Sequence, residues 1–235
     1  MKKLRLLTSY LILTLTGFGT LSGFDTSKLS MNQHEIENRV KSYYNEKLKA
    51  FGPTARGVDW NGEESQILRF EQLDKLIDTD QAFSILDYGC GYGAMYEFLL
   101  AKYGDRMTYY GYDLSVEMVE AAQKKHPQGP IFSPELPKVQ VDYVVASGIF
   151  NVKMEVKEQD WEDYIKKTLQ SIHQLTVKGF AFNILTSYSD PPYMKEYLYY
   201  AQPEQWFGYC KLAFSPWVAL NHDYPLYEFC IIVRI

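Results

Sequence analysis

The sequence predicts one α/β domain, with a doubly wound and mostly parallel sheet of seven strands and N-terminal helices as a lid. The first observation is that apolar, strand-like runs alternate with amphipathic helical segments from residue 83 onward. Alternation of this kind predicts parallel strands with helices on both faces of the sheet. The second is that the last two apolar runs, within residues 217–235, are too close together for a crossover helix. They therefore predict an antiparallel hairpin.

Size and charge limit the classes of function that the chain can have. A chain of 235 residues buries about 70–75% of the surface of its unfolded form, which is enough for one well-packed domain. The net charge is −5, and the basic residues form no long run that could bind the phosphates of a nucleic acid. We therefore expect no nucleic-acid partner.

The cysteines indicate a reducing environment. Cys90, Cys210 and Cys230 are odd in number, far apart in the sequence and without CxxC spacing. This pattern favours reduced thiols over disulfides or a zinc site. We therefore expect a cytoplasmic protein that holds no metal.

The first thirty residues indicate a different location. Lys2, Lys3 and Arg5 precede a mostly apolar stretch, residues 6–15, which has the pattern of a secretory signal and is too short to span a bilayer comfortably. The alternative is that translation starts at Met31, where a helical pattern begins, and that the preceding residues lie upstream of the true start. In both interpretations residues 1–30 are not part of the fold, and only their retention would give the protein a membrane partner.

Two helices are expected before the first strand, in an N-terminal segment, residues 31–80, that would cover the core as a lid. Helical spacing of apolar residues predicts the first helix over residues 33–51, before Gly52 and Pro53. A loop with an arginine and a tryptophan among turn-forming residues follows. The second helical pattern covers residues 63–77.

The core, residues 84–235, is expected to contain the alternating strands and helices. The expected strands cover residues 83–89, 107–113, 129–136, 141–150 and 179–187, and two more within 217–235. The expected helices cover residues 94–104, 115–126, 160–175 and 203–214, the second of them capped by Ser115.

A glycine-rich turn follows the first expected strand. Gly89, Gly91 and Gly93 stand in "ILDYGCGYG", directly before a helix. Glycines in such a turn let the backbone approach a ligand, and the N-terminus of the helix favours a polar or negative group. Asp113 comes twenty residues after Gly93, at the end of the second strand, where its carboxylate can accept bonds from both hydroxyls of a ribose. The pattern predicts a cofactor that contains a nucleoside.

The glycine pattern alone does not identify this cofactor. Gly89, Gly91 and Ala94 also match the dinucleotide fingerprint G-x-G-x-x-G/A. However, Asp87 precedes the turn by two residues, where its charge would repel a pyrophosphate and attract an ammonium or a sulfonium ion. The C-terminal hairpin also replaces the second parallel half of a dinucleotide-binding fold.

Three motifs carry a resemblance to a known family. The segments "ILDYGCGYG", "YGYDLS" and "VDYVVASGIF" resemble the successive cofactor motifs of class I S-adenosylmethionine-dependent methyltransferases. The strand pattern is similar to the seven-stranded sheet of that family, and the resemblance covers residues 84–235. The segment "ARGVDWNGEESQILRFEQL" also resembles a subgroup of small bacterial methyltransferases. The resemblance implies S-adenosylmethionine as the cofactor.

The resemblance also implies roles for single residues. Asp87 and the glycines after it would line the methionine half of the cofactor, and Asp113 would hold the ribose. Leu114 and Met118 would flank the adenine. The candidate cofactor-binding residues are Asp87, Gly89, Cys90, Gly91, Asp113, Leu114, Met118, Ser147 and Gly148.

The expected methyl acceptor is an oxygen or nitrogen atom of a small molecule. A sulfonium is already an activated methyl donor, so the protein mainly has to align the acceptor and exclude water. Acceptor residues are expected at the C-terminal ends of the fourth and fifth strands and in the lid. The candidates are Tyr44, Arg56, Trp60, Phe150 and Asn183. His222 and Tyr188 are candidates for a catalytic role, although the chemistry requires no triad.

Two further features bear on the chemistry. The motif "SDPPYM" at residues 189–194 resembles the signature of amino-methyltransferases, but it follows the fifth strand and not the fourth, so a Pro-Pro loop is the better interpretation. The fourth strand ends without the acid that Mg²⁺-dependent enzymes use, which favours metal-independent transfer. The alternatives to a methyltransferase are an NAD-dependent oxidoreductase and a non-catalytic protein that binds S-adenosylmethionine.

Overall fold

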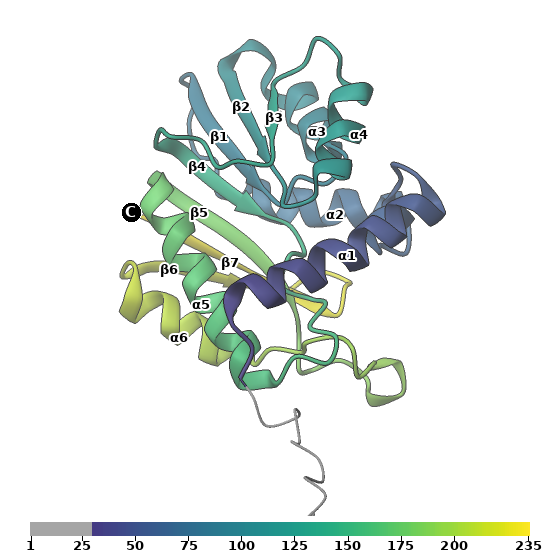
Figure 1. Cartoon of the computed structure of the whole chain (residues 1–235). Helices are drawn as coiled ribbons and strands as arrows, with labels where there is room; N and C mark the ends of the chain where they lie inside the picture. Colours follow the sequence, from purple (N-terminus) through teal and green to yellow (C-terminus); the bar gives the residue numbers. More distant parts are fainter. Residues whose placement is uncertain (1–29) are drawn as a thin grey trace, which may run out of the picture. The chain divides into compact units, whose positions relative to one another are not determined.

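Seven strands form one sheet in the computed structural model, which describes residues 30–235. They are β1 (Phe83–Tyr88), β2 (Met107–Tyr112), β3 (Ile131–Ser133), β4 (Val141–Ala146), β5 (Thr176–Leu185), β6 (Trp217–Asn221) and β7 (Glu228–Arg234). The strand order is β3-β2-β1-β4-β5-β7-β6 (Figure 1). Strands β1 to β5 pair in parallel, whereas β7 is antiparallel to both β5 and β6. The predicted sheet and its C-terminal hairpin are confirmed.

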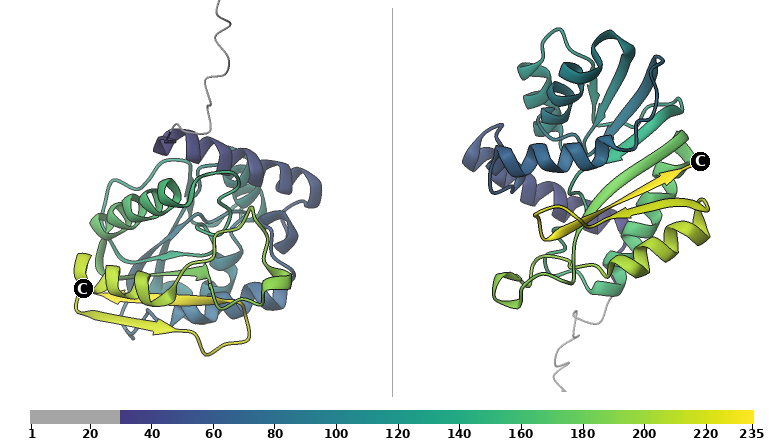
Figure 2. Two further views of the ribbon diagram at one scale, coloured as in Figure 1. Left: turned by 90° about the horizontal axis from the view of Figure 1, so that it is seen from below. Right: turned by 180° about the vertical axis from the view of Figure 1, so that it is seen from behind.

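Helices of the described residues cover both faces of this sheet (Figures 1 and 2). They are α1 (Gln33–Phe51), α2 (Glu63–Asp74), α3 (Ala94–Tyr103), α4 (Val116–Lys125), α5 (Glu158–Leu175) and α6 (Pro203–Ala213). Short 3₁₀ turns are η2 (Ala55–Val58), η3 (Gly104–Arg106) and η4 (Pro191–Tyr193). The apolar sides of α1, α5 and α6 pack into one core cluster, and those of α2, α3 and α4 pack into another. The sheet therefore separates two cores.

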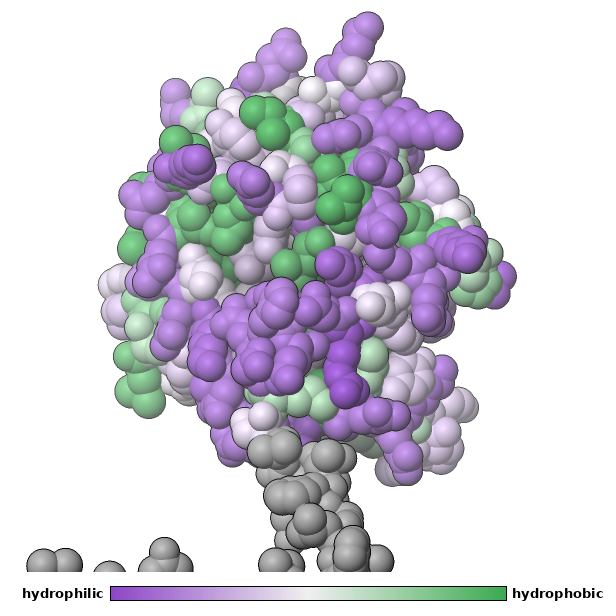
Figure 3. All heavy atoms as spheres, viewed as in Figure 1, coloured by the Kyte–Doolittle hydropathy of each residue, from purple (hydrophilic) through white to green (hydrophobic). Residues whose placement is uncertain are grey.

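Helix α1 has clear sequence signals at both ends. The Asn32 side chain accepts a bond from the backbone N–H of Glu35, and the Glu35 carboxylate accepts one from the backbone N–H of Asn32. This capping box fixes the start of the helix. Gly52, with φ of +67°, ends it. Ile36 and Val40 face the core, and Figure 3 shows hydrophilic side chains along the solvent side of the helix.

Some element boundaries differ from those that the sequence predicts. Helix α2 ends at Asp74 and not at residue 77, because the chain tightens there into turns closed by hydrogen bonds from Leu76 N to Leu73 O and from Ile77 N to Asp74 O. Strand β5 begins three residues earlier than predicted, at Thr176, which pairs with Val141 of β4. Strand β3 is shorter than predicted and has three residues.

The strand register brings the predicted site residues together. Asp87 of β1 pairs with Gly111 of β2 and with Val145 of β4. Two residues beyond these partners come Asp113 and Ser147, each just after the end of its strand. Because parallel strands end at the same edge of a sheet, these side chains meet beside the glycine turn.

The N-terminal segment contributes a layer of the domain. Helix α2 buries Phe70 and Leu73 in the core cluster that it shares with α3 and α4, and it lies against β5 and β7 (Figure 2). The predicted role of the segment as a lid stays a prediction for α1 and η2. The prediction for residues 1–30 lies outside the described residues, apart from Ser30.

None of the helices in residues 30–235 has the length and apolar content needed to cross a membrane. All three cysteines, Cys90, Cys210 and Cys230, are free and buried.

Candidate active site

A pocket lies at the carboxyl ends of β1, β2 and β4, where the strand order reverses between β1 and its two neighbours. It encloses about 890 Å³ of space, including its opening to solvent. The pocket is lined by all nine candidate cofactor-binding residues: Asp87, Gly89, Cys90, Gly91, Asp113, Leu114, Met118, Ser147 and Gly148.

The glycine turn forms the floor of this pocket. Gly89 and Gly91 have φ angles of +84° and +53°, which side chains of L-residues rarely adopt. A Cβ atom on Gly89 would lie 2.3 Å from Cγ2 of Ile149. The backbone N–H groups of Gly89 and Cys90 both donate to the carbonyl of Tyr112, at 2.7 and 2.9 Å. The turn is thus anchored to the end of β2.

Asp113 connects the turn to the next helix. Its Oδ2 accepts a hydrogen bond from Gly91 N, and its Oδ1 accepts one from Ser115 N, each at 2.9 Å. Ser115 in turn caps α4 by accepting a bond from Met118 N at 3.0 Å, as predicted. Each carboxylate oxygen of Asp113 can accept a further hydrogen bond. The carboxylate is therefore held in place with capacity for a ligand.

Asp87 is the more deeply buried of the two acids. Its Oδ2 accepts a hydrogen bond from the Tyr109 hydroxyl at 2.6 Å. The pKa of Asp87 is raised to about 7, mainly because the carboxyl group is buried. The hydrogen bond from Tyr109 lowers this pKa, and the negative charge of Asp113 raises it. A cation beside Asp87 would favour its ionised form.

Burial also raises the pKa of Asp113, to about 6, although the hydrogen bonds from Ser115 and Gly91 lower it. The pocket therefore holds two carboxyl groups that are costly to ionise without a partner. Such a pair favours a ligand that brings positive charge or hydroxyl donors.

Ser147 adds a polar atom at the end of β4. Its hydroxyl Oγ is buried and has no hydrogen-bond partner among the described residues. Buried polar atoms are usually hydrogen-bonded, so an unpaired one in a pocket indicates a place for a ligand.

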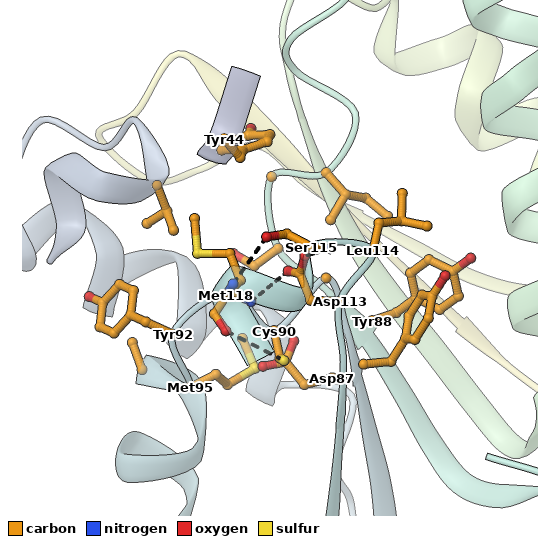
Figure 4. Close-up of a pocket in the computed structure, with 18 of the residues that line it drawn as sticks. Tyr44, Asp87, Tyr88, Cys90, Tyr92, Met95, Asp113, Leu114, Ser115 and Met118 are labelled. Atoms are coloured by element: carbon orange, nitrogen blue, oxygen red, sulfur yellow. Dashed lines mark hydrogen bonds between the residues drawn. The ribbon is translucent and has the colours of Figure 1, made fainter. Parts of the chain in front are cut away.

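Aromatic side chains form the walls of the pocket. Figure 4 shows Asp113 and Ser115 near the middle, with Tyr92 on one side, Tyr88 on the other, and Tyr44 opposite Asp87. The Tyr88 ring packs edge-on against the Tyr112 ring, with centroids 4.8 Å apart. These walls are mostly apolar and leave few polar groups to orient a ligand.

Two of the candidate acceptor residues line this pocket, Tyr44 from α1 and Trp60 from the loop after η2. Three do not. Phe150 is fully buried, with its ring edge-on to that of Phe182, and belongs to the core. Arg56 is exposed and stacks on the ring of Phe51 at 4.5 Å.

Asn183 is the third candidate that lies outside the pocket. It is buried in β5, and its Oδ1 accepts a hydrogen bond from Gly148 N at 2.7 Å. It therefore contacts the backbone of the pocket wall and does not line the pocket itself. The pattern of apolar residues around Asn183 placed it near the site but could not show which way its amide points.

The two candidate catalytic residues lie together at the surface, outside the pocket. The rings of Tyr188 and His222 are 5.9 Å apart, and the Tyr188 hydroxyl donates to Glu204 at 2.8 Å. The Asp-Pro-Pro-Tyr motif forms η4, which is exposed, and Asp190 accepts a bond from the Tyr227 hydroxyl. Its interpretation as a Pro-Pro loop is confirmed.

Sequence reasoning missed a set of polar residues in the wall of the pocket and behind it. The Tyr92 hydroxyl donates to Gln66 Oε1 at 2.9 Å, and both residues line the pocket. Arg69 and Glu228 form a buried ion pair at 2.7 Å. A signal was present, because an arginine in the apolar pattern of the second helix and a glutamate at the start of an apolar strand each require a partner.

The described residues contain no cluster of three or more His, Cys, Asp or Glu side chains that could hold a metal ion. The prediction that the protein holds no metal stays a prediction.

Comparison with known proteins gives three findings on sequence. A family model described as a methyltransferase domain matches residues 85–175. A relative from Mycobacterium tuberculosis, named "Putative methyltransferase Rv1506c", is 43% identical over 164 residues, which make up 68% of this chain and 98% of that protein. N-demethylindolmycin N-methyltransferase from Streptomyces griseus is 34% identical over 67 residues, 28% of this chain and 27% of that enzyme.

The same architecture occurs in a solved structure. A SAM-dependent methyltransferase from Leishmania major superposes with a TM-score of 0.60 at 14% identity, and the match covers 89% of this chain and 88% of that one. At this identity the likeness shows the fold alone.

Proposed function

The chain belongs to the class I S-adenosylmethionine-dependent methyltransferases, and from this premise we propose that it transfers a methyl group to an oxygen or nitrogen atom of a small molecule. A pocket with aromatic walls supports a small acceptor. The name of the Streptomyces griseus relative supports it too, since that enzyme methylates a nitrogen of a small compound by its name. The net charge of −5 speaks against a nucleic-acid acceptor.

Two observations support a fit between the pocket and S-adenosylmethionine. A side chain at Gly89 would collide with Ile149, so the floor of the pocket is bare backbone there, which a ligand can approach closely. The unpaired Oγ of Ser147 can accept a hydrogen bond from an ammonium group.

In this proposal each acid has its own task. Asp87 carries the negative charge that attracts the ammonium end of the cofactor, beside the turn of Gly89, Cys90 and Gly91. Asp113 accepts hydrogen bonds from the ribose hydroxyls with the capacity that Gly91 and Ser115 leave free. Leu114 and Met118 supply apolar contacts to the adenine.

When bound, S-adenosylmethionine supplies a methyl group on a sulfonium ion, already activated for attack by a nucleophile. The chain has to align the acceptor and to exclude water. Tyr44 and Trp60 are the proposed acceptor-side residues, because both line the pocket. The proposal needs no base from His222 or Tyr188, which lie outside it.

The proposal also includes a cytoplasmic location and methyl transfer without a metal ion. The free thiols of Cys90, Cys210 and Cys230 support a cytoplasmic location. The end of β4, Ala146 followed by Ser147 and Gly148, offers no acid to a metal, which supports metal-independent transfer.

The observation that carries the proposal is that nine residues chosen from motifs in three separate strands line one pocket, with two buried acids and an unpaired hydroxyl in it. Its test is thermal unfolding with S-adenosylhomocysteine and, in parallel, with NAD. A ligand at 100 times its Kd adds about 2.7 kcal/mol to the free energy of unfolding. We expect this gain with S-adenosylhomocysteine, none with NAD, and none in Asp87→Ala.

Stabilisation by NAD alone would contradict the proposal and favour an oxidoreductase. Release of S-adenosylhomocysteine from S-adenosylmethionine in the presence of a cell extract then separates an enzyme from a protein that only binds the cofactor. We expect release with the wild type and its loss in Asp87→Ala.

A further inference from the structure

Arg69 connects the N-terminal segment to the last strands of the sheet. It lies on α2, with only 8% of its side chain exposed, and its Nε donates to Glu228 Oε2 at 2.7 Å. Its Nη1 donates to the carbonyl of Ser65 at 2.8 Å. The guanidinium carbon lies 3.9 Å from the ring centroid of Trp60. One side chain thus pairs with an acid and stacks on an indole at the same time, as the planar guanidinium group allows.

Glu228 continues the connection toward the pocket. It is fully buried at the start of β7, and its Oε1 accepts a hydrogen bond from Asn183 Nδ2 at 2.9 Å. Burial raises the pKa of Glu228, and the charge of Arg69 acts against this. The oxygen of the same amide, Asn183 Oδ1, accepts a hydrogen bond from the backbone N–H of Gly148 at 2.7 Å.

Gly148 in turn contacts the Trp60 indole on which Arg69 stacks. The contacts from Arg69 through Glu228 and Asn183 to Gly148 therefore lead back to Trp60. Gly148 has φ of +71°, and a Cβ atom there would lie 2.2 Å from Trp60 Cζ2 and 2.3 Å from Cη2. Both Gly148 and Trp60 line the pocket. Arg69, Glu228 and Asn183 stand behind these two residues and do not line it.

We propose that Arg69 is a positioning residue that presses the Trp60 indole onto Gly148 and so fixes the pocket wall beside β4. This inference rests on the proposed function. The ion pair with Glu228 sets the place of the guanidinium group, the guanidinium plane sets the angle of the indole, and Asn183 holds Gly148 against it.

A role in stability alone explains this arrangement less well. Burying an ion pair costs about as much desolvation energy as the attraction returns, so apolar residues in the same place would stabilise the fold at least as well. The stack of Arg69 on Trp60 also orients a residue of the pocket, which stability of the fold does not require. A ligand binds more tightly to a wall that is already in place, because no freedom of the indole is lost on binding.

The test distinguishes an effect of Arg69 on the position of Trp60 from an effect on the stability of the fold. In Arg69→Met, Glu228 loses its partner, and the melting temperature should fall. In the double variant Arg69→Met with Glu228→Gln, no buried charge is left unpaired, and a glutamine can still accept from Asn183. The control is Lys102→Met in α3, which removes the ion pair of Lys102 with Asp74, a residue that lies on α2 like Arg69 but away from Trp60.

Each variant is titrated calorimetrically with S-adenosylhomocysteine, and its tryptophan emission is recorded with and without this ligand. Trp60→Phe identifies the part of the emission change that comes from Trp60. We expect the double variant to recover the melting temperature of the wild type, to bind about tenfold more weakly and to lose the Trp60 signal. Lys102→Met should bind within about twofold of the wild type.

Wild-type affinity in the double variant would overturn the inference and leave the proposed function standing. Equal weakening of binding in Lys102→Met would also overturn it, because the loss of any ion pair made by α2 would then have the same effect. If the wild type binds no S-adenosylhomocysteine at all, the proposed function fails and the inference fails with it.

Discussion

The two sides of the pocket are built in different ways. On the side of β1 and β2, the glycine turn, Asp113 and the cap of α4 are connected by hydrogen bonds between residues at most 22 positions apart. On the side of β4, the wall of Trp60 and Gly148 depends on Arg69 and Glu228, which are 159 positions apart. The first side forms once two neighbouring strands pair, whereas the second requires the complete sheet, including β7.

This difference has consequences for substitutions. A change on the side of β1 and β2 removes contacts to the ligand while the sheet keeps its core. A change on the side of β4 disturbs packing between α2, β5 and β7, and therefore affects stability and the pocket together. Four predictions test this contrast, beginning with the largest effect.

Replacement of Asp113 should strongly weaken the binding of S-adenosylhomocysteine. Asp113→Ala removes a charged acceptor for the ribose hydroxyls, and hydrogen bonds to charged groups contribute about 1.5–3 kcal/mol each. We expect the Kd from calorimetry to rise about 100-fold. Asp113→Asn keeps one acceptor oxygen and should give a smaller rise. Asp105→Ala, at an exposed acid in η3, is the control and should leave the Kd unchanged; an equal rise there would contradict a specific role of Asp113.

The affinity for S-adenosylhomocysteine should depend on pH through Asp87. The pKa of Asp87 is raised to about 7 by burial, so below this pH the carboxyl must lose a proton before it can pair with the ammonium group of the ligand. We expect the Kd to rise by up to about tenfold for each pH unit below 7 and to level off just above pH 7. In Asp87→Asn the binding should be weaker, and this dependence should disappear.

The free energy of unfolding of the protein without ligand should fall as the pH rises, whereas the affinity for S-adenosylhomocysteine should rise. The folded protein binds protons at Asp87 and Asp113 more tightly than the unfolded chain does, because both pKa values are raised, to about 7 and about 6. The contribution of these two groups to the free energy of unfolding is thus fully present below their unfolded pKa of about 4 and is lost as the pH rises to 7. Denaturant unfolding of wild type and Asp87→Asn across this range checks the sign.

Gly148→Ala should show the coupling on the side of β4. The added Cβ would collide with the Trp60 ring, and a residue other than glycine is strained at φ of +71°. We expect a loss of about 1–3 kcal/mol in the free energy of unfolding, measured by thermal unfolding. Gly208→Ala in α6, where a Cβ meets nothing within 4 Å, should be neutral or slightly stabilising. Equal losses in both variants would contradict the proposed contact.

The same contrast explains how much could be predicted from the sequence. The sheet, its hairpin and the cap at Ser115 follow from local patterns of apolar residues and turn formers, and they are confirmed. The side of β1 and β2 follows from two motifs in consecutive strands, since Asp87 and the glycines belong to one strand–turn–helix unit and Asp113 ends the next strand.

The side of β4 could not be predicted in the same way. Asn183 was expected near the acceptor, but its amide points at Gly148 and Glu228, and only the antiparallel register of β5 with β7 decides this. His222 and Tyr188 stand at the surface because they follow strand ends that lie apart from the pocket. The direction of a side chain across a sheet depends on partners distant in sequence, which one sequence does not reveal.

The most direct test of the central claim, that buried acids receive a cationic cofactor, is the count of protons released when S-adenosylhomocysteine binds. Calorimetry at pH 6.5 in two buffers of different ionisation enthalpy measures this count. We expect one bound ligand per chain at both pH values, with net release of protons at pH 6.5 and no release at pH 8, where Asp87 is already ionised. Absence of binding, or binding without proton release at pH 6.5, would contradict it.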